Sequence, residues 1–283
     1  MSNKSNNKFD LHCHSYFSDG SLSPNELIDL AKERNLSGIS ITDHDTLAPY
    51  NEKLFSYAKK TKVELLTGVE ISSSLDGINV HILAYGFDYK NIEFNEFLKK
   101  LQERRRNRNK LILKNLEKEL NFKTSYEEFL TFAKIKGFHS DAALGRPSIA
   151  MLLVEKGFVP NFQYAFDRYI CDSGPCYVKW DKFSCQEVIK NIHMANGFAV
   201  LAHPQLVKNR KALHVLESLN FDGFEETKSL FNREAKKLVK RAKERGKIIT
   251  SGSDFHGAIR PHVNLGSSYT SRDVFEKLLN KKK

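Results

Sequence analysis

Short apolar runs recur along the chain, and most of them lead into a polar segment that contains Asp, Glu or His. Seven such runs predict strands, at residues 9–11, 38–41, 63–67, 79–85, 198–202, 223–226 and 248–251. Strands that alternate with helical stretches favour a parallel sheet. Polar residues that follow the carboxyl ends of the strands favour a barrel with its active site at that end. We therefore expect a seven-stranded barrel, one strand short of the regular eight.

The pattern changes between about residue 95 and residue 180, where no convincing strand occurs. Apolar residues recur there at helical spacing, first Phe94, Phe97, Leu98 and Leu101, then Leu111, Ile112, Leu116 and Leu120. Shorter helices are predicted at 125–136, 146–156 and 161–169. Two capping boxes, Ser23 to Glu26 and Ser184 to Glu187, predict helix starts on either side of this region. We expect a barrel of residues 1–98 and 180–283, with a helical insertion at 99–179 that contributes to substrate binding.

Composition restricts the class of protein. A hydrophobic fraction of 40% supports a core, and no run approaches the roughly 20 apolar residues of a membrane span. The start of the sequence has no apolar signal segment, and the four cysteines of the whole chain form no CxxC pair. We therefore expect a cytoplasmic protein with free thiols. No membrane contact and no obligate protein partner are inferred. The net charge of +11 favours an anionic partner, although a lysine- and asparagine-rich composition gives such a charge without any function.

Histidine and acidic residues gather in a few short segments. Six of the ten histidines lie in them: His12, His14, His44, His81, His203 and His256. Neutral imidazole and carboxylate oxygen are ligands for Zn²⁺, Mn²⁺ or Fe²⁺. Residues i and i+2 of a strand share a face, so His12 and His14 can point at one metal, as can Asp254 and His256. The segments therefore predict a multinuclear metal site.

The predicted site suits hydrolysis of a phosphate ester. Two or three divalent metals generate hydroxide at neutral pH and stabilise charge during in-line displacement. Redox chemistry fits less well, because the set contains no thiolate or haem-type ligands. We expect Mn²⁺ first, with Fe²⁺ and Zn²⁺ as alternatives.

These segments resemble the motifs of the polymerase and histidinol phosphatase (PHP) superfamily. The matching segments are Asp10-Leu11-His12-Cys13-His14-Ser15, Thr42-Asp43-His44-Asp45, Gly68-Val69-Glu70-Ile71-Ser72, the strand with His81, Ala202-His203-Pro204, and the run from Gly252 to Gly257. The motif Gly145-Arg146-Pro147 and the closing run are more similar to the bacterial branch of nucleotide phosphatases and 5′-to-3′ exoribonucleases. Nucleoside 3′,5′-bisphosphate phosphatases are part of that branch.

The resemblance implies a distorted (β/α)7 barrel that holds three metals. The implied ligand groups are His12, His14, Glu70 and Asp254; Asp19, His44 and His256; and Glu70, shared with a third metal, with His81 and His203. Asp19, His44, Glu70, His203 and His256 are then the residues nearest the reaction. Asp43 and Asp45 are expected to orient ligands or cap helices. Glu225 lies on a strand where the family also has Glu and is expected to orient ligands.

The resemblance also implies substrate contacts from the insertion. Arg146 matches a family motif and could grip a phosphate, or it could be an ordinary residue at a helix start. Ser148 stands where the family usually has His, and can still donate one hydrogen bond. Arg106 represents the basic run 104–108, which is either a phosphate contact or a solvated helix face. Lys179 and Trp180 are weaker candidates for the wall of the cleft.

We expect a metal-dependent phosphoesterase that acts on nucleoside 3′,5′-bisphosphates, on short 5′-phosphorylated RNA, or on both. The alternatives are a histidinol-phosphate phosphatase, a non-catalytic metal-bound accessory module and an amidohydrolase. A compact pocket would favour the first alternative, and a missing ligand would favour the second. The basic insertion and the complete ligand set favour nucleotides.

Overall fold

Two sheets form the body of the molecule in the computed structural model, which describes residues 7–179, 181–226 and 232–280. The first sheet is parallel and contains β1 (Phe9–Cys13), β2 (Gly38–Ile41) and β3 (Glu64–Leu65). The second runs in the order β4 (Gly68–Leu75), β5 (Ile78–Tyr85), β6 (Phe198–Leu201), β7 (Gly223–Glu225) and β8 (Ile248–Thr250). The fold is therefore mixed α/β.

Single bridges join the two sheets where continuous ladders would close a barrel. Cys13 pairs with Phe255, just after β8, and His44, just after β2, pairs with Glu70 of β4. The expected seven-stranded barrel thus differs from the structure, which has eight strands in two sheets and no closed barrel among the described residues. The ladders stop there because the chain leaves extended geometry at these strand ends and turns into the loops that carry the polar motifs.

β5 is antiparallel to both of its neighbours, so the expectation of an all-parallel sheet is wrong for this strand. A two-residue turn joins β4 to β5, with φ of 48° at Asp76 and 84° at Gly77. Two successive positive φ angles give the turn that matches the twist of a hairpin, and Asp-Gly is its usual sequence. Of the predicted strand at 63–67 only Glu64 and Leu65 are in a strand, β3, and Glu70 belongs to the separate, longer β4.

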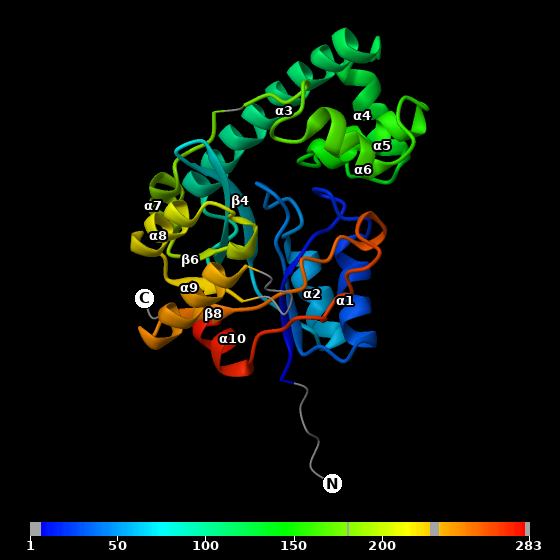
Figure 1. Cartoon of the computed structure of the whole chain (residues 1–283). Helices are drawn as coiled ribbons and strands as arrows, with labels where there is room; N and C mark the ends of the chain where they lie inside the picture. The colour runs from blue at the N-terminus through cyan, green and yellow to red at the C-terminus, as the bar shows by residue number, and fades with distance from the viewer. Residues whose placement is uncertain (1–6, 180, 227–231, 281–283) are drawn as a thin grey trace.

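Helices cover the outer faces of both sheets (Figure 1). α1 (Pro24–Glu33) and α2 (Glu52–Thr61) contact β2 and β3, and α7 (Cys185–Met194) contacts β4, β5 and β6. The remaining body helices are α8 (Arg210–Ser218), α9 (Arg233–Glu244) and α10 (Arg272–Leu279). Ser23 and Ser184 cap α1 and α7 with reciprocal bonds to Glu26 and Glu187, which confirms both predicted helix starts.

The 29-residue helix α3 (Ile92–Leu120) connects the body to a separate group of helices (Figure 1). Its first half buries Phe94 and Leu101 in the main hydrophobic cluster, and its second half buries Ile112 and Leu116 in another. That second cluster is completed by α4 (Tyr126–Ile135), α5 (Arg146–Glu155), α6 (Phe162–Ala165) and a π-helical turn (Phe166–Ile170). The predicted helices of this region are confirmed, while the domain boundaries at 98/99 and 179/180 stay a prediction.

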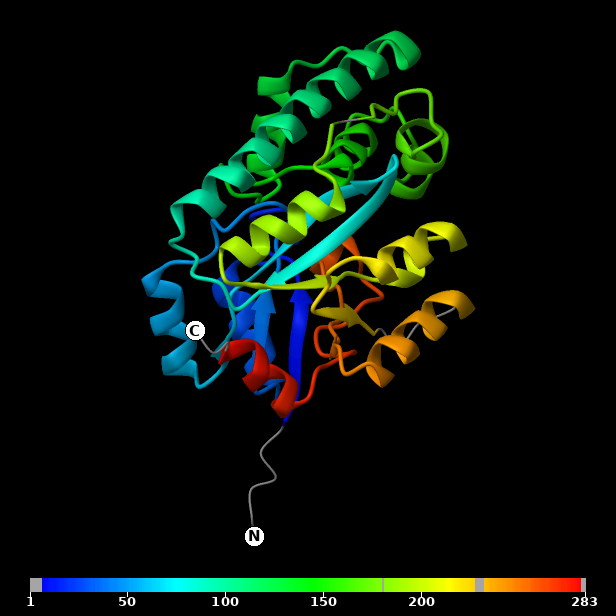
Figure 2. The ribbon, with the colours of Figure 1, turned by 90° about the vertical axis from the view of Figure 1, so that its left-hand side faces the viewer.

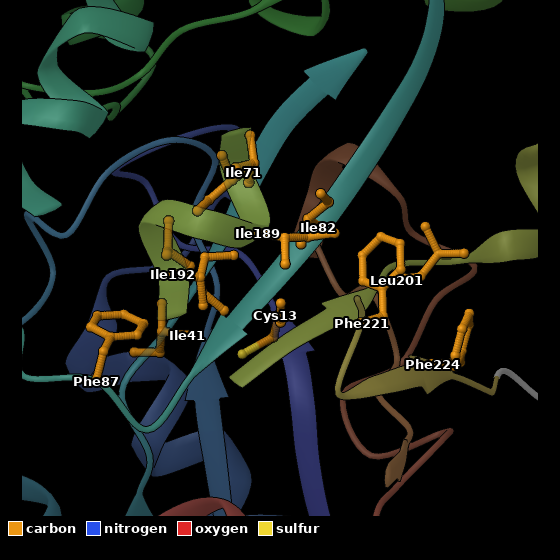
Figure 3. Close-up of a cluster of buried hydrophobic side chains, with 14 of the residues drawn as sticks. Cys13, Ile41, Ile71, Ile82, Phe87, Ile189, Ile192, Leu201, Phe221 and Phe224 are labelled. Atoms are coloured by element: carbon orange, nitrogen blue, oxygen red, sulfur yellow. The ribbon is translucent and has the colours of Figure 1, made fainter. Parts of the chain in front are cut away.

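The main core includes the space between the second sheet and α7, which Figure 3 shows, and extends to residues of β1, β2, α1, α2, α8 and α9. Ile71 of β4, Ile82 of β5 and Leu201 of β6 pack with Ile189 and Ile192 of α7. Side chains alternate along a strand, so Glu70, beside Ile71, points to the opposite face of β4. None of the helices within the described ranges is both long and apolar enough to cross a membrane.

Candidate metal centre and the adjoining cleft

The structure brings the nine predicted metal ligands together at the junction of the two sheets. They come from the ends of β1, β2, β6 and β8, from the interior of β4 and β5, and from the loop after β1. Three groups place one ligand atom of each member within 4.8 Å of the others: His14, Asp19, His44 and His256; His12, His14, Glu70 and Asp254; and His44, Glu70 and His81. His203 joins the third group, with its Nε2 2.8 Å from Glu70 Oε1.

The carboxylate of Glu70 is the centre of this arrangement. Its Oε2 lies 3.2–3.3 Å from one ring nitrogen of each of His12, His14 and His44. Its Oε1 lies 2.8 Å from His81 Nδ1 and 2.8 Å from His203 Nε2. Glu70 is only 1% exposed, so all these contacts are shielded from bulk water. One carboxylate therefore connects donors from both sheets.

Asp19 and Asp254 complete the two outer groups. Asp19 Oδ1 lies 3.3 Å from His256 Nε2, and its Oδ2 lies 3.7 Å from His44 Nε2. Asp254 Oδ1 lies 3.4 Å from His12 Nε2 and 3.3 Å from His14 Nε2. Both carboxylates thus share histidines with the Glu70 group, so the three groups form one continuous set.

The donors fit divalent metal ions. Five ring nitrogens are buried without a hydrogen bond of good geometry among the described residues: His12 Nε2, His14 Nε2, His44 Nδ1, His81 Nδ1 and His256 Nε2. Buried polar atoms without a partner are costly, and a metal ion would satisfy them. Two ligands at about 2.1 Å from one metal lie about 3.0–3.4 Å apart, which is the spacing found around Glu70 Oε2. This geometry supports binding of divalent metals.

Glu225 orients two of these histidines. Its Oε1 lies 2.8 Å from His12 Nδ1, and its Oε2 accepts the backbone N–H of His203 at 2.7 Å. A proton on His12 Nδ1 leaves Nε2 free to bind a metal. His256 is oriented in the same way, because its Nδ1 lies 2.8 Å from the backbone carbonyl of Asp254. The sequence pointed to Glu225 through its predicted strand and through the resemblance, because the family also has Glu on this strand.

Two buried aspartates hold the motif loops in place. Asp10 accepts the backbone N–H groups of His12, Ser253 and Gly266, and so ties the end of β1 to the loops after β8. Asp43 accepts the Ser15 backbone N–H at 2.9 Å, and also the hydroxyl groups of Ser15 and Ser18. Burial raises the pKa of both carboxyl groups to about 6.

The ligand carboxylates are kept ionised by their neighbours. Burial opposes ionisation of Glu70, yet the surrounding His44, His81 and His12 hold its pKa well below its usual range. The same balance holds the pKa of Asp254 low, through Arg260 and His12. In turn, Asp254 and Glu70 raise the pKa of His14 to about 10 against the effect of burial, so a metal that binds this imidazole would have to release its proton.

Two of the predicted ligands have an unusual backbone. φ is 26° at His203 and 56° at Asp254, in the left-handed region that residues other than glycine rarely adopt. Such strain concentrates at functional sites, where the surrounding contacts fix it. Here the bonds from His203 N–H to Glu225 and from Asp254 N–H to His12 O provide those contacts.

A cleft of about 740 Å³ opens beside the histidines. Its walls include four candidate metal ligands, Asp19, His44, His81 and His203, together with six cationic side chains. Two of the cations, Lys208 and Arg260, are exposed. The other four, Arg105, Arg108, Arg146 and Lys182, are buried or half-buried and come from the middle of α3, the start of α5 and the segment before α7. The cleft therefore joins the metal ligands to a positively charged wall.

The four predicted substrate residues have different surroundings. Arg146 lines the cleft, whereas Ser148 is fully buried inside α5. Arg106 is exposed on α3 and is not among the residues lining the cleft. Exposed Lys179 lines an adjoining hollow, which shares Gly77 and Lys182 with the cleft. The suggested Trp180 lies outside the described residues.

Three cleft cations were missed from the sequence, Lys182, Lys208 and Arg260, whereas Arg105 and Arg108 belong to the basic run 104–108 that was represented by Arg106. Arg105 and Arg108 continue the apolar stripe of α3 at helical spacing between Leu101 and Ile112, and both are buried. Their position on the buried face of the helix could have indicated this location from the sequence, because a charged residue on a buried stripe has to face a partner or a cleft. Lys182 lies between elements, and no periodicity indicates its direction.

Comparisons with known proteins agree with this geometry. Residues 10–174 match the profile of a family described as "PHP domain". The chain is 32% identical to a 5′-3′ exoribonuclease of Haemophilus influenzae, over 88% of this chain and 90% of that protein. It is 30% identical to a 3′,5′-nucleoside bisphosphate phosphatase of Chromobacterium violaceum, over 87% and 86% respectively.

Solved structures share the whole fold. A protein of Bifidobacterium adolescentis, described as a candidate metal-dependent phosphoesterase, superposes with a TM-score of 0.85 at 28% identity, over 96% of both chains. A Chromobacterium violaceum protein described as an amidohydrolase, with sulfate bound, gives a TM-score of 0.80 at 26% identity, also over 96% of both chains.

Proposed function

The chain belongs to the PHP-domain family and is a metal-dependent phosphoesterase, and from this premise we propose that its substrates are nucleotides. We infer that it removes phosphate from nucleoside 3′,5′-bisphosphates, from short 5′-phosphorylated RNA, or from both. One observation carries this proposal: the candidate metal ligands and four buried or half-buried cations line the same cleft. A single phosphate monoester needs only the metals, whereas an extended anion also uses the cationic wall.

The residues divide into three proposed metal sites. His12, His14, Glu70 and Asp254 would hold one metal; Asp19, His44 and His256 a second; and Glu70, His81 and His203 a third. Divalent ions bound there would supply a hydroxide nucleophile and stabilise negative charge on the phosphate. Glu225 fixes the orientation of His12 and His203, and the neighbouring Asp10 and Asp43 hold the loops that present the other ligands.

The cationic wall would bind and orient the rest of the substrate. Arg105 is already held by Asp45 at 2.5 Å and by Ser72 at 2.9 Å, so it shapes the wall. Arg146 and Arg108 present planar guanidinium groups, which suit phosphate oxygens. Ser148 is buried within α5, and we propose a packing role for it in place of direct contact. Arg106 and Lys179 are exposed and do not line the cleft itself, so we propose for them at most contacts with the outer part of a longer RNA.

The relatives favour nucleotides over histidinol phosphate. One is named an exoribonuclease and the other a nucleoside bisphosphate phosphatase. A histidinol-phosphate phosphatase would suit a compact pocket, and the cleft of about 740 Å³ with six cations is larger and more basic than that substrate requires. A non-catalytic accessory role is disfavoured because each proposed site keeps its donors.

Phosphate release by the Mn²⁺-loaded protein tests the proposal. The three substrates are adenosine 3′,5′-bisphosphate, a 5′-phosphorylated RNA oligomer and histidinol phosphate. We expect turnover of the bisphosphate or stepwise loss of 5′ nucleotides, abolished by His203→Ala. His214→Ala changes an exposed histidine of α8 and should leave the rates unchanged. Activity on histidinol phosphate alone, or no activity in fully metallated protein, would reject the nucleotide proposal.

A further inference from the structure

Asp172 connects the helical insertion to the β4–β5 hairpin across the cleft. Its Oδ1 accepts from Arg146 Nη1 at 2.6 Å, and its Oδ2 accepts from Asn79 Nδ2 at 2.5 Å. Asn79 Oδ1 in turn accepts from Lys182 Nζ at 2.8 Å. Figure 2 shows the tip of the hairpin next to the loops of the insertion. A carboxylate of the protein thus accepts from Nη1 of a cleft arginine, which also donates to the Ile170 carbonyl at 2.9 Å.

The surroundings of Asp172 are strongly positive. Arg108 and Arg146 both lie over the ring of Tyr177, at 5.7 Å and 5.6 Å from its centroid. Burial, followed by the nearby Arg146 and Arg105, lowers the pKa of Arg108 to about 9. Burial, followed by Arg105 and Arg108, lowers the pKa of Lys182 to about 7. Cations that destabilise one another in this way favour binding of a further anion.

We propose that Arg146, Arg108 and Lys182 form a second anion subsite, which takes the non-reacting phosphate of a doubly phosphorylated nucleotide, and that Asp172 occupies Arg146 until this phosphate displaces it. The inference rests on the proposed function and specifies its substrate class. Asp172 is therefore an internal competitor of the substrate and a determinant of specificity.

The geometry fits a phosphate on one nucleotide. α5 begins at Arg146 with no side-chain cap on its N-terminal N–H groups, and both Arg146 and Pro147 line the cleft. A helix start next to an arginine favours a dianion over a carboxylate. Asn79 and His81 share a face of β5, and their Cα atoms are about 7 Å apart along the strand. A ribose with phosphates on two of its oxygens can bridge such a span.

Asp172 is able to leave this position. Its side chain is 56% exposed, compared with 21% for Arg146, so the carboxylate regains water when a phosphate takes its place. An exposed ion pair contributes little net energy, whereas a dianion on the same guanidinium forms stronger charge-assisted hydrogen bonds. Displacement therefore requires no rearrangement of the core.

Substrate pairs separate the subsite from the metal centre. KM and kcat are measured with Mn²⁺-loaded protein for adenosine 3′,5′-bisphosphate and for both adenosine monophosphates. Asp172→Asn should lower KM for the bisphosphate by about threefold to tenfold, and Arg146→Met should raise it by about tenfold to a hundredfold, because a charge-assisted bond is lost. KM for the monophosphate that carries only the reacting phosphate should stay within about twofold, because that substrate does not use the subsite. The effects on the bisphosphate should appear in KM more than in kcat. In the Arg146→Met background, Asp172→Asn should have no effect.

Glu155→Gln is the matched control, because it removes the charge from another ion pair of α5, between Lys136 and Glu155 at 2.8 Å. It should leave both KM values unchanged; a shift equal to that of Asp172→Asn would overturn the subsite. Calorimetric binding of the bisphosphate to the metal-free variants gives a readout independent of turnover. If the protein hydrolyses none of these esters, the proposed function fails, while the binding differences still test the subsite. If it hydrolyses them with an unchanged preference in every variant, the subsite alone fails.

Discussion

At the scale of single residues, Glu225 determines which ring nitrogen of His12 carries the proton. It accepts two hydrogen bonds, one from the fixed N–H donor of His203 and one at His12 Nδ1. A glutamine accepts with one atom and donates with the other. If its oxygen takes the His203 N–H, its NH₂ group faces His12 Nδ1 and forces the proton onto Nε2, where a metal ligand needs a lone pair.

We therefore expect Glu225→Gln to weaken binding of divalent metal by about tenfold to a hundredfold, with little change in folding. Metal titration followed by calorimetry measures the affinity, and circular dichroism checks the fold. Glu226→Gln changes the exposed neighbour and is the control. Equal metal affinity in the two variants would show that Glu225 does not set the tautomer of His12.

Arg105 and Arg106 are adjacent residues whose replacement should change the free energy of unfolding by very different amounts. Arg105 is 7% exposed and binds the buried Asp45, whose pKa it lowers against the effect of burial, whereas Arg106 is exposed. Arg105→Met leaves a buried carboxylate without its cation, and we expect a loss of about 3–5 kcal/mol in the free energy of unfolding. Arg106→Met should change it by no more than about 0.5 kcal/mol. Urea denaturation compares the two, and similar losses would contradict the buried ion pair.

At the scale of elements, the approach of the segment after β8 to β1 leaves no room for a side chain. A Cβ on Gly252 would lie 2.3 Å from His12 Cβ and 2.4 Å from His12 N. Gly252→Ala therefore has to push β1 and its two histidines away from the other ligands. We expect a loss of roughly 3 kcal/mol in the free energy of unfolding and weaker metal binding.

Gly246 separates this steric effect from backbone strain. It has φ of 72°, and a Cβ there would meet no atom within 4 Å. Gly246→Ala should cost about 1 kcal/mol through its conformation alone and leave metal affinity unchanged. Denaturant curves and metal titrations of both variants test this contrast. If Gly252→Ala keeps full metal affinity, the close packing of the two segments does not position His12.

Element predictions succeeded where the signal was local. The caps of α1 and α7 and the spacing of Phe94 to Leu101 on α3 depend on neighbours within a few residues, and the structure has these helices. The direction of β5 also had a local signal, the Asp76-Gly77 pair, which the strand-and-helix rhythm of the rest of the chain obscured.

At the scale of the whole molecule, the sequence indicated which side chains gather but not how the sheets meet. The ligand motifs are short, and their residue types together with the family resemblance selected the nine side chains that now lie together. Closure of the barrel and the direction of Lys182 depend on contacts between distant segments, such as Cys13 with Phe255 and Lys182 with Asn79. No pattern along the chain encodes the strength of those contacts.

The division of the molecule into two hydrophobic clusters leads to a test of how metal binding stabilises it. The candidate ligands belong to both sheets of the body, whereas none comes from the helices α4, α5 and α6. A ligand that binds only the folded protein stabilises it by about 2.7 kcal/mol at a concentration 100 times its Kd. The added stability should therefore appear in the body, where the metals would tie the two sheets together.

Hydrogen exchange measures this directly. Addition of Mn²⁺ to the metal-free protein should slow exchange of the amides in β1, β4 and the segment after β8, and leave α4 and α5 unchanged within about a factor of two, since local units open independently. Adenosine 3′,5′-bisphosphate should then slow exchange at the start of α5 and around Asp172. In the His203→Ala variant, Mn²⁺ should slow amide exchange in the body less than in the unmodified protein, while the exchange rates of α4 stay the same. Equal protection of both clusters by metal alone would mean that the body and the insertion unfold as one unit, and that α3 transmits the full stability of the metal centre between its two ends.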